Sequence, residues 1–137
     1  MPTLNNSKDL EKYIKLCMKN ALECTGEELR KKLMEFIDQD FYQKYKPKEY
    51  IRSYQLKNSP EFIALSNALI EIFIDTDSMN YKEAEGDWVA QLAAKGYHGG
   101  YAIFREGYYW EDFLDYVHSN IIDIYKSELK KQGLSVT

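Results

Sequence analysis

The residue types with the richest potential chemistry in this chain are its two histidines, His98 and His118. His98 lies in a glycine-rich stretch, and His118 follows Asp115 by three residues in a region of helical spacing. A histidine and a carboxylate three apart share one helix face and offer two metal ligands, whereas a zinc site needs more. We therefore expect no metal site, and expect both histidines to be solvated or hydrogen-bonded.

Sequence motifs for covalent or phosphate chemistry are missing from the chain. GxSxG, the P-loop, GxGxxG, HExxH and CxxC do not occur in the sequence. We therefore predict no enzymatic activity and no cofactor. A small hydrolase that uses His98 or His118 is the catalytic alternative, and loss of a measured activity on mutating either histidine would support it.

Carboxylates gather between residues 75 and 87. We expect a solvated acidic loop there, and a calcium site or an acidic docking surface is the alternative. The spacing is not that of an EF-hand. Together with His98, three of these residues are the candidate partner-contact positions: Asp75, Asp77 and Asp87.

Tyrosines and basic residues alternate between residues 41 and 56, a pattern that single-strand nucleic-acid-binding surfaces also show. The whole chain, however, has 22 acidic and 18 basic residues and a net charge of -4. Nucleic-acid and anionic-membrane binding rest mainly on Lys and Arg, so we expect neither. A partner contact or the edge of the core is the preferred interpretation, because tyrosine suits interfaces.

The elements that must position these residues begin with an amphipathic helix over 7–40, which Ser7 is expected to cap. Gly26 interrupts the pattern, and a capping box formed by Thr25 and Glu28 would split it in two; we favour one helix because the apolar stripe nearly keeps its phase. Such a helix is about 50 Å long, overhangs a domain of this size and is expected to pack on another molecule. Cys17 and Cys24 are predicted to be reduced and to lie on its apolar face.

The remaining elements follow Pro47, which is expected to stop the helix or follow its end closely. A hairpin is predicted over 61–74 around Ser66 and Asn67, with its second strand covered on both faces. The other predicted elements are a helix over 88–95 with Asp87 as its N-cap, a flexible glycine loop over 96–100, a strand over 101–104, and a helix over 109–132 capped by Gly133. The 137 residues, 45% of them hydrophobic, suit a single domain.

One segment resembles a known family. The matching positions are Tyr42, Tyr45, Pro47, Tyr50, Arg52, Ser53 and Leu56. They resemble the Tyr-x-x-Tyr-x-Pro-x-x-Tyr-x-Arg-(Thr/Ser)-x-x-Leu segment of the neck, or tail-completion, family of long-tailed bacteriophages and prophages. The surrounding order is similar too, with a long helix before, a hairpin after, and Trp110 opening the last helix. The resemblance spans roughly 35–132 and departs over 82–96.

The resemblance implies an α+β fold, in which a long N-terminal helix and a C-terminal helix pack on a small antiparallel sheet. It implies a structural virion protein, assembled in the bacterial cytoplasm, that forms a ring joining the head–tail connector to the tail terminator or tail tube. It implies no catalytic residues, and a six-fold ring is favoured over a twelve-fold one. The expected structural and interface residues are Tyr42, Tyr45, Pro47, Tyr50, Arg52, Leu56 and Trp110. The alternative is a small acidic, immunity-type protein that inhibits a basic bacterial partner.

Overall fold

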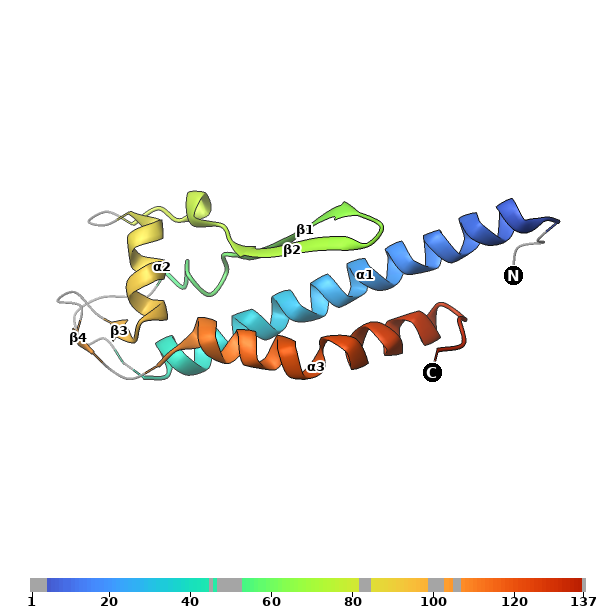
Figure 1. Cartoon of the computed structure of the whole chain (residues 1–137). Helices are drawn as coiled ribbons and strands as arrows, with labels where there is room; N and C mark the ends of the chain where they lie inside the picture. The colour runs from blue at the N-terminus through green and yellow to red at the C-terminus, as the bar shows by residue number, and fades with distance from the viewer. Residues whose placement is uncertain are drawn as a thin grey trace.

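The computed structural model describes residues 5–44, 46, 53–81, 85–98, 103–104 and 107–136. The molecule is elongated: helices α1 (Ser7–Ile37) and α3 (Tyr109–Lys131) run antiparallel, and a β-hairpin lies along α1 (Figure 1). The short helix α2 (Gly86–Ala94) stands across the end of the molecule at which α3 begins. This arrangement confirms the predicted α+β fold of a long N-terminal helix, a C-terminal helix and a small antiparallel sheet. The hairpin and α3 both pack mainly on α1.

The N-cap of helix α1 lies one residue earlier than the sequence predicted. Asn6, not Ser7, is the N-cap, and its side-chain oxygen accepts a hydrogen bond from the Asp9 backbone N–H at 3.0 Å. The Asp9 carboxylate in turn accepts from the Asn5 N–H at 3.2 Å. These two bonds satisfy free N–H groups of the helix start, and the Asp9 charge suits the positive end of the helix dipole.

The helix continues through Gly26 without a break, as favoured from the sequence. Thr25 does not cap a second helix, because its hydroxyl donates back to the Ala21 carbonyl at 2.8 Å. Gly26 instead makes room for the hairpin: a Cβ at this position would lie 2.7 Å from a ring carbon of Phe62. After Ile37 the chain continues as a π-helix, η1 (Asp38–Tyr42), so the helical region ends at Tyr42.

The hairpin consists of β1 (Pro60–Ser66) and β2 (Leu69–Ile74), paired antiparallel. Its turn falls at 67–68, one residue later than predicted, because the register shifts between Ala64 and Ser66. The expectation that the second strand is covered on both faces is wrong. One face packs on α1, whereas Leu69 and Glu71 of β2 are exposed, as are Ile63 and Leu65 on the paired strand β1.

Between the hairpin and α3 the chain forms several short elements. A 3-10 turn, η2 (Thr76–Ser78), precedes α2, which begins at Gly86 with Glu85 as its N-cap. Asp87 is therefore not the cap; its carboxylate accepts from the Trp88 N–H at 2.9 Å, inside the first turn. Gly96, at φ +90°, closes α2 as predicted.

Residues expected to lie in the glycine loop form a strand instead. The strand β3 (Tyr97–His98) pairs with β4 (Ile103–Phe104), so the predicted strand over 101–104 is present at its second half, and 99–102 lie outside the described residues. The pairing brings the Tyr97 and Phe104 rings to 5.5 Å between centroids.

Helix α3 ends in the way its glycine predicted. The Gly133 N–H bonds to the Lys130 carbonyl at 3.0 Å, and the Leu134 N–H bonds to the Leu129 carbonyl at 3.2 Å. Together with φ +93° at Gly133, these bonds make a Schellman motif. The end of α3 then meets α1, where the Gln132 carbonyl accepts from the Tyr13 hydroxyl at 3.5 Å.

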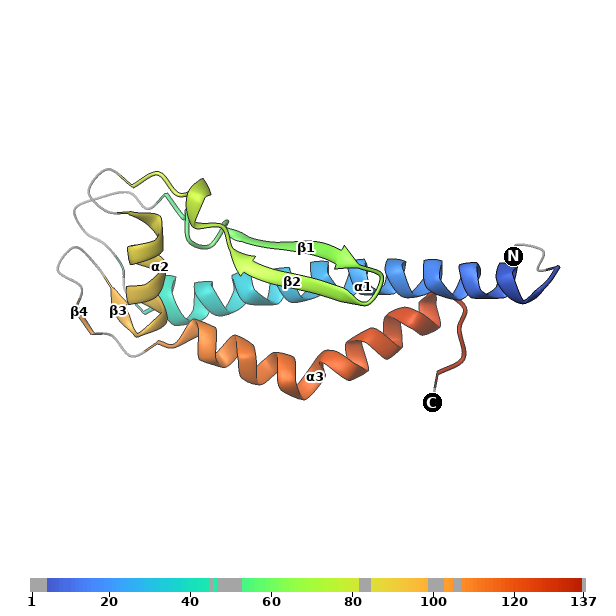
Figure 2. The same ribbon diagram turned by 45° about the horizontal axis from the view of Figure 1, so that its top comes forward.

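The core lies between α1, α3 and α2, at the end of the molecule away from the start of α1 (Figure 2). Its buried apolar members are Leu29, Leu33, Ile37, Tyr42, Leu56, Met79, Ala90, Ala93, Tyr109 and Phe113. Both cysteines are free, but only Cys17 is buried. The prediction for Cys24 is wrong, because the neighbouring Thr25 takes the buried position. None of the helices, within the described ranges, is long and apolar enough to cross a membrane.

Candidate assembly surface

The connection between α1 and the hairpin buries Tyr42, and Tyr54 packs on it while staying partly exposed. The rings of Tyr42 and Tyr54 lie 4.8 Å apart between centroids, and the Tyr42 hydroxyl accepts from the Lys57 backbone N–H at 3.3 Å. Tyr54 holds a φ of 56°, a conformation uncommon outside glycine. Leu56 is completely buried beside them. Tyr42 and Leu56 therefore belong to the core and offer little to a partner.

Polar contacts fasten this connection on two sides. The Lys57 ammonium lies 3.1 Å from an Asp38 carboxylate oxygen at the end of α1. The Gln55 side chain bonds to both the carbonyl, at 3.3 Å, and the N–H of Asn80, in the segment after the hairpin. The described part of the segment is thus held between α1 and the chain that leaves β2, in line with an ordering role.

Four of the predicted interface residues, Tyr45, Pro47, Tyr50 and Arg52, lie outside the described residues. The expectation that Pro47 fixes the exit from the helix, and that Arg52 makes a fixed polar contact, stays a prediction. Trp110 lies half-buried in the first turn of α3, with its ring 5.7 Å from that of Phe113.

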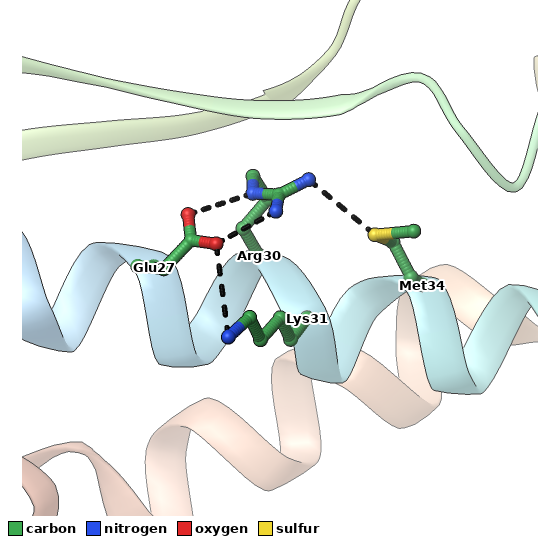
Figure 3. A network of polar contacts seen from close by, with 4 residues as sticks. All are labelled: Glu27, Arg30, Lys31 and Met34. Carbon is green, nitrogen blue, oxygen red and sulfur yellow. Dashed lines mark hydrogen bonds and ion pairs between the residues drawn. The ribbon is translucent and has the colours of Figure 1, made fainter.

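A polar network on α1 faces the hairpin (Figure 3). Arg30 donates two hydrogen bonds to the Glu27 carboxylate, at 2.7 and 2.8 Å, and one to the Met34 sulfur at 3.4 Å. The guanidinium lowers the pKa of Glu27, and the carboxylate raises the pKa of Arg30. Glu61 on β1 also raises the pKa of Arg30. The charges of Glu27 and Arg30 are thus paired with each other beside β1.

The structure brings the carboxyl groups of Asp40 and Asp112 together, a proximity that no motif in the sequence predicts. Asp40 is 4% exposed, and its Oδ2 has no hydrogen-bond donor within the described residues. Burial, and then the nearby Asp112 carboxyl, raise the pKa of Asp40 to about 7. The site is tight, because a Cβ on Gly107 would overlap the Asp40 backbone carbonyl. Asp40 lies in the π-helical turn, and long-range packing alone brings Asp112 to it.

The predicted partner-contact carboxylates lie at the end of the molecule that holds α2. Asp77 and Asp87 are exposed and Asp75 is half-buried. Glu85, Glu111 and Asp115 are exposed at the same end, and none of these six carboxylates forms an ion pair with another described residue. This leaves a strongly acidic surface.

Of the two histidines, the structure describes the side chain of His118 alone. The His98 backbone forms part of β3, and its side chain lies outside what the structure describes. His118 is exposed on α3. Within the described ranges, no group of three or more His, Cys, Asp or Glu residues is arranged to hold a metal ion.

Exposed aromatic side chains accompany the acidic surface. Phe104 is 51% exposed, with Tyr97 and Tyr108 partly exposed beside it, and Trp88, in the first turn of α2, is 54% exposed. The Phe104 ring lies 5.5 Å from Tyr97 and 6.3 Å from Tyr108, packed over Gly96. Aromatic residues are frequent between residues 97 and 110 in the sequence, and the pairing of β3 with β4 brings Tyr97 and Phe104 into contact. We call this surface the acidic–aromatic end; its members are Glu85, Asp87, Trp88, Tyr97, Phe104, Tyr108, Glu111 and Asp115.

A second exposed surface lies at the opposite end, on the first turns of α1. Of the apolar stripe noted in the sequence, Cys17, Leu29 and Leu33 are buried by the chain's own elements, whereas Leu10 and Ile14 are exposed. The expected overhang is thus limited to the start of the helix. We call this surface the α1 tip; its members are Lys8, Leu10, Lys12, Ile14, Lys15, Leu16 and Lys19.

A comparison with protein families finds a match that covers most of the chain. A family model described as YomN matches residues 6–132. The matched range contains every helix and strand described above, from α1 to α3. No curated protein and no solved structure matches the chain.

Proposed function

Because the chain belongs to the YomN family, which is associated with phages and prophages, we propose that it is a structural protein of a phage or phage-like particle. In this proposal its copies form a ring at the head–tail junction and join the connector to the tail. The role is mechanical, without cofactor or catalysis, and the protein resides in the virion after assembly in the host cytoplasm.

The observation that carries the ring proposal is the α1 tip. Leu10, at 45% exposed, and Ile14, at 37%, lie one turn apart on one face near the start of α1, where the hairpin and α3 leave them exposed. Large apolar side chains grouped in this way mark a contact with another molecule. A ring of identical copies supplies such a contact at every subunit.

The resemblance to tail-completion proteins supports the place of the ring. Those of its residues that the structure describes, Tyr42 and Leu56 among them, pack as a fixed connection between helix and hairpin. The neighbours of the ring are then the connector on one side and the tail terminator or tube on the other, with six copies favoured over twelve. Within the acidic segment 75–87, Asp75 and Asp77 are the residues proposed to reach these neighbours.

Electron microscopy of the particle that carries this protein tests the proposal. We expect six copies at the neck, arranged as a closed ring. Twelve copies would correct the number and keep the role. Absence from purified particles, together with a monomer that binds one basic bacterial protein, would overturn it in favour of the small acidic inhibitor.

A further inference from the structure

We infer that the two ends of this molecule bind each other, so that the α1 tip of one copy docks on the acidic–aromatic end of the next. The inference rests on the proposed ring and specifies the two surfaces that form it. Its partner is therefore a second copy of this chain, and its chemistry combines complementary charge with apolar contact.

The charges of the two surfaces are opposite. Over residues 8–19, α1 carries four lysines against two carboxylates, Asp9 and Glu11, so its start is net positive. Of these lysines only Lys15 forms an ion pair within the described residues, with Glu11 at 2.8 Å. The positive end of the α1 dipole lies at the same place. The acidic–aromatic end presents Glu85, Asp87, Glu111 and Asp115, none of them paired there. Complementary charges of this kind orient partners and speed their encounter.

Both surfaces also expose apolar side chains that can pack on each other. The tip offers aliphatic side chains, Leu10, Ile14 and Leu16, and the other end offers the aromatic rings of Trp88, Tyr97, Phe104 and Tyr108. Aromatic residues are the usual anchors of interfaces, surrounded by a polar rim. On α1 the four lysines share one side of the helix, which Leu16 borders, whereas Leu10 and Ile14 lie on another side.

One copy cannot join its own two ends. They lie at opposite ends of the long axis (Figures 1 and 2), separated by α1, whose 31 residues span about 46 Å. A contact between different patches of identical copies is heterologous, so it repeats from copy to copy and gives a ring when the rotation closes.

The first experiment compares matched leucine variants by analytical ultracentrifugation over a range of protein concentrations. Leu10→Glu with Leu16→Glu changes the tip, and Leu65→Glu with Leu69→Glu makes the same chemical change at equally exposed positions of the hairpin. We expect the wild type and the hairpin variant to associate alike, and the tip variant to associate at least about tenfold more weakly. Circular dichroism checks that all three fold.

The second experiment uses charge reversal. Lys8→Glu with Lys12→Glu makes the tip acidic, and Glu111→Lys with Asp115→Lys makes the other end basic. Each variant alone is expected to lose association, because like charges then meet. A one-to-one mixture is expected to regain it, because the intact tip of one variant meets the intact end of the other. A mixture that stays monomeric would overturn the inference.

The outcomes separate this inference from the proposed ring. Association that survives the tip variant and fails in the hairpin variant would overturn the inference and leave a ring built through the hairpin. A wild type that is monomeric at every concentration would overturn it too, and the particle micrographs then decide independently whether a ring exists.

Discussion

Asp40 is a buried carboxylic acid whose pKa is raised well above that of an exposed aspartate. A carboxyl group with a pKa near 7 in the folded state and about 3.9 in the unfolded state binds its proton more tightly when folded. The folded protein therefore holds a proton between pH 4 and 7 that the unfolded chain has released. Its contribution is fully present below pH 4 and is lost as the pH rises to about 7.

This linkage gives a pH-dependent prediction. Asp40→Asn removes the titration and keeps the size of the side chain. The wild type loses stability between pH 5 and pH 8 and the variant does not, so the unfolding free energy of the variant minus that of the wild type should increase by roughly 1–3 kcal/mol over this range. Urea denaturation at the two pH values measures it. Asp77→Asn, at an exposed carboxylate, is the control and should show no such change. Equal pH dependence in wild type and Asp40→Asn would contradict the assignment.

The two cysteines should differ in reactivity. Cys24 is exposed and Cys17 is buried, where its thiol lies 3.8 Å from the Gln132 carbonyl. We expect a maleimide to label Cys24 at least about tenfold faster than Cys17 in the folded protein, because access limits the reaction. Mass spectrometry of the Cys17→Ser and Cys24→Ser variants assigns each rate. Equal rates in native buffer would contradict the packing of the α3 end on α1.

Among the elements, α1 and the hairpin meet most closely at Gly26 and Phe62. Alanine is the better helix former by about 1 kcal/mol, so Gly26→Ala would stabilise an isolated helix. Here the added methyl group meets the Phe62 ring, and we expect a net loss of roughly 1–2 kcal/mol. A double-mutant cycle with Phe62→Leu tests the cause, because the smaller side chain should recover most of the loss. Additive effects would show that the hairpin does not sit on this face.

Periodicity in the sequence predicted the elements whose causes are local. The long helix and the last helix follow from their apolar spacing, and the end of α3 follows from Gly133. The caps at Asn6 and Glu85 were each missed because neighbouring residues of similar chemistry compete for the position. The hairpin turn moved by one residue because an irregular register, and not its sequence, sets it.

The features that the sequence did not predict depend on contacts between residues far apart in the chain. Asp40 and Asp112 come from different helices, and nothing in either segment alone signals the other. The aromatic surface likewise depends on the pairing of Tyr97 with Phe104. Of the residues chosen for a partner contact, Asp77 and Asp87 lie on an exposed surface, whereas Tyr42 and Leu56 proved to be core. Tyrosine spacing alone does not distinguish these two uses.

At the scale of the whole molecule, opposite charges at the two ends make association sensitive to salt. The Debye length falls from about 10 Å at 0.1 M to about 3 Å at 1 M ionic strength, so exposed charge pairs are screened. We expect the dissociation constant between copies to rise by roughly tenfold or more between 0.05 and 0.5 M NaCl. Sedimentation at several salt concentrations measures it. Association that strengthens with salt would point to a purely apolar contact.

The contact between the end of α3 and the start of α1 also has a consequence for how the protein is made. The Gln132 carbonyl that receives the Tyr13 hydroxyl is synthesised 119 residues later. At ordinary rates of translation, that delay is on the order of ten seconds. During this time the hairpin is already available to cover the middle of α1, while the stripe around Cys17 and Ala21 has no partner. A nascent chain stalled within α3 would therefore expose this stripe to chaperones, and release of a full copy would hide it.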